Sequence, residues 1–164
     1  MTGDNELRQI VRQWVRQVDG GIAFTGTVRQ CIFDHSGNRR WVTDQDLHIN
    51  TARFTERASR DVFTRKVVRL GRLLRYAGSI EGSSNEKRRH VHLTIGGYRN
   101  TQEMLQALTA LPVRWRNSTW GYEDVDVKEL VTFRDRELWE RYLLKDISLR
   151  TFDRFIIDER YRQI

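Results

Sequence analysis

Two short apolar runs, separated by a polar loop, constrain the fold of this chain more than any other feature. Residues 76–81 and 90–95 have the composition of strands, and the loop between them is rich in glycine, serine and asparagine. This pattern predicts an antiparallel hairpin. Successive side chains of a strand point to opposite faces, so His90 and His92 project from the same face. The hairpin would bring Glu81, at the end of the first run, beside these two histidines.

These three side chains form a candidate metal site. His90 and His92 offer imidazole nitrogens and Glu81 offers carboxylate oxygens, which leaves positions on the metal open for a phosphate oxygen. This donor set suits Mn²⁺ or Mg²⁺, although zinc and other transition ions would also bind, so the sequence does not choose the metal. The other two histidines, His35 and His48, lie where no regular element is predicted and are interpreted as surface residues.

Length, charge and cysteine content limit the class of protein. A chain of 164 residues fits one domain. It has 29 Lys and Arg against 22 Asp and Glu, which gives a net charge of +7. Because arginine side chains suit phosphate recognition, nucleic acid is the expected partner. The alternative is that the charge serves solubility alone. The single cysteine, Cys31, excludes an internal disulfide framework. No signal peptide and no apolar run of ~20 residues is visible, which predicts a cytoplasmic protein without a membrane partner.

The spacing of apolar residues predicts alternating helices and strands. Helices are expected near residues 4–20, 51–74, 100–111 and 135–147, and strands at 22–28, 76–81, 90–95 and 121–130. Residues 34–50 are predicted to be loop. In the second helix Phe63, Val67, Leu70 and Leu74 form the expected core stripe, and the third helix is expected to stop before Pro112. This order predicts an α+β fold, with a central antiparallel sheet of about five strands and helices packed against it.

A tyrosine and a lysine complete the candidate chemistry. Tyr142 and Lys145 occupy neighbouring positions on one face of the last predicted helix. A phenol is a poor nucleophile while it is protonated, so a nearby cation is needed to favour phenolate. Lys145 would supply that charge or bind the phosphate. The alternative is that Tyr142 is a core aromatic beside Leu138 and Trp139.

Three motifs, in order along the chain, resemble those of the HUH endonucleases, specifically the single-tyrosine replication initiators that start rolling-circle replication of plasmids and small single-stranded DNA replicons. Residues 24–28 resemble the first motif of these proteins, residues 90–93 the His-hydrophobe-His motif, and residues 142–146 the Tyr-x-x-Lys motif with its acidic follower. Glu81 falls where such proteins often place a third metal ligand. The resemblance spans residues 22–147.

The resemblance implies a fold, a reaction and a set of partners. It implies one HUH endonuclease domain over residues 1–164 with a ferredoxin- or RRM-like sheet, made of an N-terminal helix extension (1–20), a catalytic core (22–147) and a C-terminal tail (148–164). Tyr142 would attack a phosphate in single-stranded DNA at an origin hairpin, leaving a 5′-phosphotyrosine link and a free 3′-hydroxyl. Lys145 would help to position the tyrosine or the phosphate.

DNA is expected to lie across one hydroxyl residue of the first motif and several basic residues. These are Thr27, Arg29, Arg39, Arg40, Lys87, Arg88 and Arg89. Two departures stand out: Gly26 replaces the apolar residue common in the first motif, and residues 31–50 form a longer stretch than many relatives have. Because no nucleotide-binding Gly-rich loop follows, the chain is either an isolated nuclease domain or works with a host or separately encoded helicase.

Three other functions compete with this one. A two-histidine phosphodiesterase would use residues 92–95, but its second copy is missing, since the nearest candidate at 48–50 lacks the hydroxyl residue. A non-catalytic module would bind single-stranded nucleic acid through arginines and aromatics such as Trp115 and Trp120. A transposase would use the same HUH chemistry but join two element ends.

Overall fold

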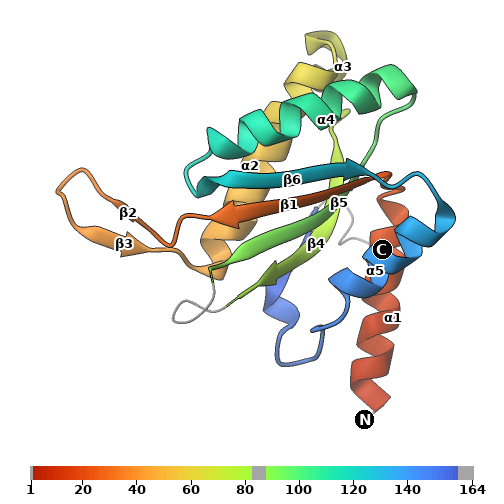
Figure 1. Ribbon diagram of the computed structural model, residues 1–164, viewed down its shortest axis with the longest axis horizontal. Coiled ribbons are helices and arrows are strands. Elements are labelled where there is room, and N and C mark those ends of the chain that lie inside the picture. The colour runs from red at the N-terminus through yellow and green to blue at the C-terminus, as the bar shows by residue number, and fades with distance from the viewer. Residues whose placement is uncertain (1, 83–87, 159–164) are drawn as a thin grey trace.

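The computed structural model describes residues 2–82 and 88–158, and in this part of the chain a five-stranded antiparallel sheet forms the centre of the molecule (Figure 1). The strand order is β6-β1-β5-β4-β7. The strands are β1 (Ile22–Val28), β4 (Arg75–Glu81), β5 (His90–Gly96), β6 (Gly121–Glu129) and β7 (Phe155–Ile157). With two helices, α2 (Asp44–Val62) and α4 (Thr101–Arg116), the sequence β1-α2-β4-β5-α4-β6 is the βαββαβ pattern of ferredoxin-like folds. The predicted fold class is therefore confirmed.

Helices α2 and α4 cover one face of the sheet and bury the main core there (Figure 1). Three fully buried aromatic side chains meet at its centre: Phe24 of β1, Phe54 of α2 and Trp115 of α4, with ring centroids 5.1–5.4 Å apart. Gly26 lies against this cluster, because a β-carbon at that position would lie 2.5 Å from Cε2 of Trp115. The indole therefore explains why the first motif carries glycine here instead of a larger apolar residue.

Two further helices, α1 (Thr2–Gln17) and α5 (Phe133–Leu143), lie across the opposite face and enclose a second core (Figure 1). Val11 and Val15 of α1 pack with Leu143 of α5 in this core. The carboxylate of Glu140 joins the two helices through ion pairs with the guanidinium groups of Arg12 at 2.8 Å and Arg16 at 3.0 Å. The N-terminal helix extension predicted over residues 1–20 thus contains helix α1, which braces α5.

The region between residues 34 and 74 differs from the prediction. Residues 34–50 are not all loop, since they contain β3 (Arg39–Trp41), which pairs with β2 (Cys31–Phe33), and the start of α2. Thr43 begins α2 through a capping box with Asp46, a Thr-x-x-Asp signal that explains why the helix starts well before Thr51.

The predicted second helix also ends early. Helix α2 stops at Val62, and a separate short helix, α3 (Arg65–Arg69), follows. Phe63 and Leu74 are buried as expected, but Leu70 was wrongly assigned to the core and is 78% exposed. The break after Val62 removes the continuous helical spacing on which that assignment depended.

Pro112 does not end α4. Proline lacks the N–H that would bond the carbonyl four residues earlier, yet the helix continues to Arg116. Leu111 and Trp115 on either side of it are fully buried, so their packing keeps the last turn helical.

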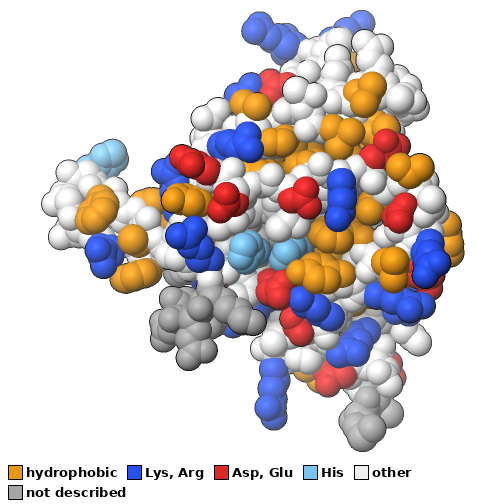
Figure 2. Space-filling model, viewed as in Figure 1, with side chains coloured by type: hydrophobic (Ala, Val, Ile, Leu, Met, Phe, Trp, Pro, Cys, Tyr) orange, Lys and Arg blue, Asp and Glu red, His pale blue; other side chains and the backbone are white. Residues whose placement is uncertain are grey.

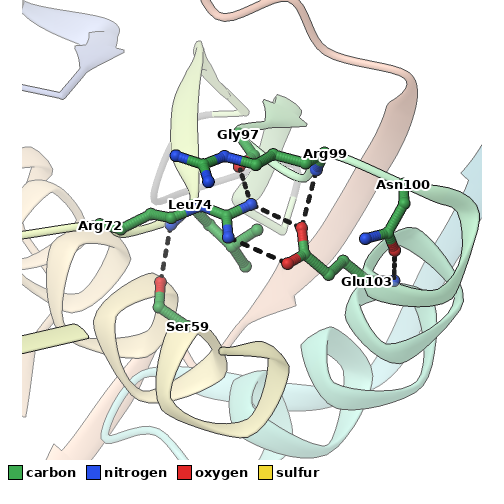
Figure 3. A network of polar contacts seen from close by, with 7 residues as sticks. All are labelled: Ser59, Arg72, Leu74, Gly97, Arg99, Asn100 and Glu103. Carbon is green, nitrogen blue, oxygen red and sulfur yellow. Dashed lines mark hydrogen bonds and ion pairs between the residues drawn. The ribbon is translucent and has the colours of Figure 1, made fainter. Parts of the chain in front are cut away.

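A network of polar contacts fixes the loop that enters β4 to the start of α4 (Figure 3). The guanidinium of Arg72 donates to both carboxylate oxygens of Glu103, at 2.9 and 2.5 Å, and to the carbonyl of Gly97. Glu103 also accepts from the backbone N–H of Arg99 at 2.7 Å. Arg72 is therefore held within the fold by an ion pair.

The segment that follows α5 adds the edge of the sheet. A 3-10 turn (Phe152–Arg154) leads into β7, which pairs with β4. Residues 148–164, predicted to be a tail, thus provide a buried edge strand as far as the structure describes them. Within the described residues, none of the helices is long and apolar enough to cross a bilayer.

Candidate active site

The register of β4 and β5 places the predicted metal ligands on one face of the sheet. Glu81 pairs directly with His90, and His92 pairs with Ser79 on the same strand as Glu81. Directly paired residues of antiparallel strands share a face, and so do residues two apart. The predicted hairpin is therefore present, and it brings Glu81 beside the histidines.

Two threonines on the neighbouring strand β1 hold the histidine rings in place from the side. The hydroxyl of Thr25 lies 3.0 Å from Nδ1 of His92, and the hydroxyl of Thr27 lies 3.4 Å from Nδ1 of His90. The two rings are nearly parallel, with an interplanar angle of 22° and centroids 6.0 Å apart. With Nδ1 engaged, Nε2 of each ring is the nitrogen left for other partners.

Thr27 therefore has a different position from the one expected of a DNA-contacting residue. It is buried, and its hydroxyl supports His90. The supporting role of Thr25 and Thr27 was missed from the sequence, although their spacing of two matches that of the histidines they contact.

Helix α5 places Tyr142 beside the histidine pair. Thr132 caps this helix through a capping box with Asp135, and Tyr142 is its last residue but one. The Tyr142 hydroxyl donates to Oε2 of Glu81 at 2.7 Å and lies 3.4 Å from Nε2 of His92. The tyrosine is half-buried, so it is not the fully enclosed core aromatic of the alternative interpretation.

Lys145 lies just beyond the end of α5, which stops at Leu143 and not at residue 147 as predicted. Its ammonium still reaches the site: Nζ donates to Oε1 of Glu81 at 2.8 Å and lies 4.1 Å from the centroid of the Tyr142 ring. Glu81 thus contacts both residues, and its Oε2 is also 3.0 Å from Nε2 of His92.

These contacts set the protonation of the site at neutral pH. Burial alone would raise the pKa of Glu81, but hydrogen bonds from Lys145 and Tyr142 and the lysine charge outweigh it and lower that pKa to about 2. Burial lowers the pKa of His92 to about 4, against the opposing charge of Glu81. Burial and the hydrogen bond to Glu81 raise the pKa of Tyr142 above its ordinary value. The carboxylate is therefore ionised, the imidazole of His92 neutral and the phenol protonated.

The donor types fit a divalent cation. His90 and His92 have their second nitrogens supported by hydroxyl groups, as metal-bound histidines usually do, and neutral imidazole is the form that binds a metal. In the described residues, however, no group of three or more His, Cys, Asp or Glu side chains is arranged to hold a metal ion. The carboxylate of Glu81 is instead engaged by Lys145 and Tyr142.

The site opens into a pocket of about 450 Å³. Its lining residues are Thr25, Glu81, Gly82, Arg88, His90, His92 and Tyr142. Figure 2 shows histidine side chains reaching the surface near the middle of this face, with acidic, basic and apolar side chains around them. Trp139 stacks on the Tyr142 ring, with centroids 5.4 Å apart, and so steadies the tyrosine at the edge of the pocket.

The basic residues predicted to bind DNA fall into two groups. Arg29, Arg39, Arg40 and Arg88 are exposed, and Arg88 lines the pocket. Arg89 is different: its side chain is 12% exposed and donates to Asp44 at 2.7 Å, so its role is to hold the start of α2 against β5. Lys87 lies outside the described residues.

His48 does not join the other histidines. Its Nε2 lies 2.8 Å from the carbonyl oxygen of Asp153, in the 3-10 turn. A two-histidine phosphodiesterase would need this residue, as part of a second motif, facing His92.

Comparison of the chain with protein-family models, with curated proteins and with solved structures gives no match.

Proposed function

We propose that this protein is a metal-dependent endonuclease and strand transferase that cuts single-stranded DNA at a specific site, as the replication initiators of the HUH class do. One observation carries the proposal: the Tyr142 hydroxyl lies within hydrogen-bond distance of Glu81 and 3.4 Å from Nε2 of His92. These residues come from distant parts of the chain, and the sequence motifs predict this chemistry for each of them.

Tyr142 is the nucleophile of the proposed reaction. Its oxygen bonds to phosphorus as the bond between phosphorus and the 3′ oxygen breaks, and the 3′ oxygen takes a proton from water. The phenolic proton leaves to water, which balances the proton that the 3′ oxygen takes up, and Oε2 of Glu81 orients the hydroxyl through the hydrogen bond that it accepts. The products are a 5′-phosphotyrosine link and a 3′-hydroxyl that primes synthesis, and the reverse attack by a 3′-hydroxyl rejoins strands.

Other residues of the site stabilise the charge that develops. A carboxylate with a pKa of about 2 is too weak a base to take the phenolic proton, so loss of that proton depends on stabilising the phenolate. The ammonium of Lys145, 4.1 Å from the Tyr142 ring centroid, favours that phenolate. A divalent cation, Mn²⁺ or Mg²⁺, held by His90, His92 and Glu81, would supply Lewis-acid polarisation of the scissile phosphate. Arg88, exposed at the pocket, suits a neighbouring phosphate.

The decisive experiment looks for a covalent protein–DNA adduct. The protein is incubated with a labelled origin-type single-stranded hairpin and Mn²⁺, and the products are separated on a denaturing gel. The parent protein should give a DNA-linked band, which a chelator, Tyr142→Phe or His92→Ala should each abolish. Tyr98→Phe is the matched control, because this hydroxyl contacts the backbone N–H of Gly21 away from the pocket, and it should leave the band in place.

Two results would contradict the proposal in different ways. An adduct that persists in Tyr142→Phe would mean that another residue is the nucleophile. Tight binding of single-stranded DNA by the parent protein, with no adduct under any metal, would instead favour the non-catalytic binding module.

A further inference from the structure

The β2–β3 hairpin, residues 31–41, has two different faces. The pairs Cys31–Trp41 and Phe33–Arg39 lie directly opposite each other, so these four side chains share one face. Ile32 and its partner Arg40 lie on the other face. We call these the outer face and the inner face.

The inner face fixes the hairpin to the body of the protein. Ile32 packs against the main core. Arg40 forms an ion pair with Asp46 at the start of α2, and its guanidinium lies 5.6 Å from the centroid of the Trp120 ring. A backbone hydrogen bond from Val42 to Gln30 closes the base of the hairpin. The hairpin is thus held in a defined position relative to the sheet.

The outer face presents large aromatic side chains to solvent. Phe33 is 67% exposed and Trp41 is 55% exposed. The guanidinium of Arg39 lies between them, 5.9 Å from the Phe33 ring centroid and 5.5 Å from that of Trp41. The result is a ladder of ring, cation and ring along one face of the hairpin.

The position of this ladder relates it to the candidate active site. Cys31, where the hairpin begins, is four residues after Thr27, which contacts His90, so extended chain between them spans at most ~14 Å. In Figure 1 the hairpin projects beyond the sheet at this end of β1, and in Figure 2 the same lobe carries exposed apolar and basic side chains. At the same end Arg88, which lines the pocket, lies 5.2 Å from the ring centroid of Tyr122.

We propose that the outer face of the hairpin binds unpaired bases of the DNA strand that flanks the phosphate attacked by Tyr142. This inference rests on the proposed function and names where the substrate strand continues beyond the pocket. Bases stack on exposed aromatic rings with little sequence preference, and an adjacent arginine adds a cation–π contact and attracts phosphate. A duplex would hide the base faces, so the partner is the unpaired strand.

Affinity for a flanked strand tests this proposal in the full chain. Two labelled oligonucleotides carry the same hairpin, one ending near the cut site and one continuing as single strand, and anisotropy is measured in a Tyr142→Phe background so that nothing is cleaved. The double variant Phe33→Ser with Trp41→Ser should lose about 10-fold or more in affinity for the longer strand and little for the shorter one. The control double variant, Leu70→Ser with Phe133→Ser, removes apolar groups that are 78% and 81% exposed elsewhere and should bind as the parent does.

A second measurement follows Trp41 itself. Binding of the longer strand should quench part of the tryptophan fluorescence, and Trp41→Phe should lose that part of the quenching while it retains most of the affinity, because phenylalanine also stacks. Circular dichroism confirms that each variant is folded.

The outcomes separate this inference from the proposed function. Equal affinity of the parent and the Phe33/Trp41 variant for the longer strand would overturn the hairpin proposal, and so would an equal loss for a fully paired flank. Loss of a concentration-dependent self-association in the variant, with unchanged DNA binding, would overturn it in favour of a contact between copies. Absence of the covalent adduct leaves these binding results standing and contradicts only the nuclease assignment.

Discussion

The histidine nearest to Tyr142 should make the stability of the fold depend on pH in a defined window. His92 is buried at the site, and burial lowers its pKa from 6.5 to about 4. The unfolded chain takes up the proton at pH 6.5, whereas the folded chain takes it up only near pH 4. Between these values the unfolded state binds more protons, so stability is complete above pH 6.5 and falls as the pH is lowered to 4.

The size of the effect follows from the shift. A change from 6.5 to about 4 corresponds, at 1.36 kcal/mol per unit, to about 3 kcal/mol of unfolding free energy. Only 8% of the His92 side chain is exposed, so solvent screens little of it. Glu81 contributes stability in a lower pH window. Its pKa is 4.5 in the unfolded chain and about 2 in the folded one, so the stability that it contributes is lost as the pH falls from 4.5 to 2.

Urea unfolding, followed by tryptophan fluorescence, measures the effect at about pH 7 and about pH 4.5. The parent protein should lose about 2 kcal/mol more than His92→Gln does between these two conditions, because the loss is not yet complete at pH 4.5. His35→Gln is the matched control, since His35 is exposed in the turn between β2 and β3, and it should follow the parent. Comparing differences cancels the carboxylates that titrate in the same range.

A direct titration decides whether the reasoning is correct. The imidazole resonance of His92, assigned by its loss in His92→Gln, should move with a midpoint near 4 in a nuclear magnetic resonance titration. A midpoint near 6.5, or equal losses of stability in parent and His92→Gln, would show that the ring is not enclosed as described.

Three further predictions concern the surroundings of the site. Glu140→Gln should lower the unfolding free energy by ~1–3 kcal/mol and speed hydrogen exchange in α5, because two arginines of α1 lose their buried partner. The control Glu137→Gln breaks an exposed pair with Arg141 and should lower the unfolding free energy by less than ~0.5 kcal/mol. Equal losses for the two variants in urea unfolding would rule out a bracing role for Glu140. Gly26→Ala should lower the unfolding free energy by ~1–3 kcal/mol, because the added methyl group clashes with Trp115. The double variant Gly26→Ala with Trp115→Phe should lose less than the sum of the losses of the two single variants. Strictly additive losses would contradict the clash. Mn²⁺ at ~100 times its dissociation constant should stabilise the parent protein by ~2.7 kcal/mol in a thermal melt. The double variant His90→Gln with His92→Gln should not respond to Mn²⁺. A parent melting temperature that does not change with Mn²⁺ would contradict the metal site.

Local patterns in the sequence predicted the elements that carry the site. The sequence has a short polar segment between residues 76–81 and 90–95, and this pattern predicted their pairing and the common face of Glu81, His90 and His92. Tyr142 and Lys145 were predicted to be neighbours on one helix. They remain neighbours although the helix ends between them, because the turn after Leu143 keeps the lysine over the tyrosine ring.

Contacts between distant segments could not be predicted in the same way. The support of His90 by Thr27 depends on the register between β1 and β5, which nothing local specifies. The burial of Arg89 depends on Asp44, at the start of a helix whose beginning was placed too late. The edge strand β7 is three residues long, too short for its alternation to be recognised, and pairing with β4 defines it.

Glu81 connects the chemistry of the whole site. Its carboxylate accepts hydrogen bonds from Tyr142 and Lys145 and lies 3.0 Å from His92. The same negative charge raises the pKa of the phenol and that of the lysine, so it holds both protonated. A positive charge that binds this carboxylate would weaken the hydrogen bond that it accepts from the Tyr142 hydroxyl, while Lys145 would stay beside the ring. In the proposed reaction, Tyr142 would therefore be unreactive on its own, and its activation would depend on what binds Glu81 and the histidines.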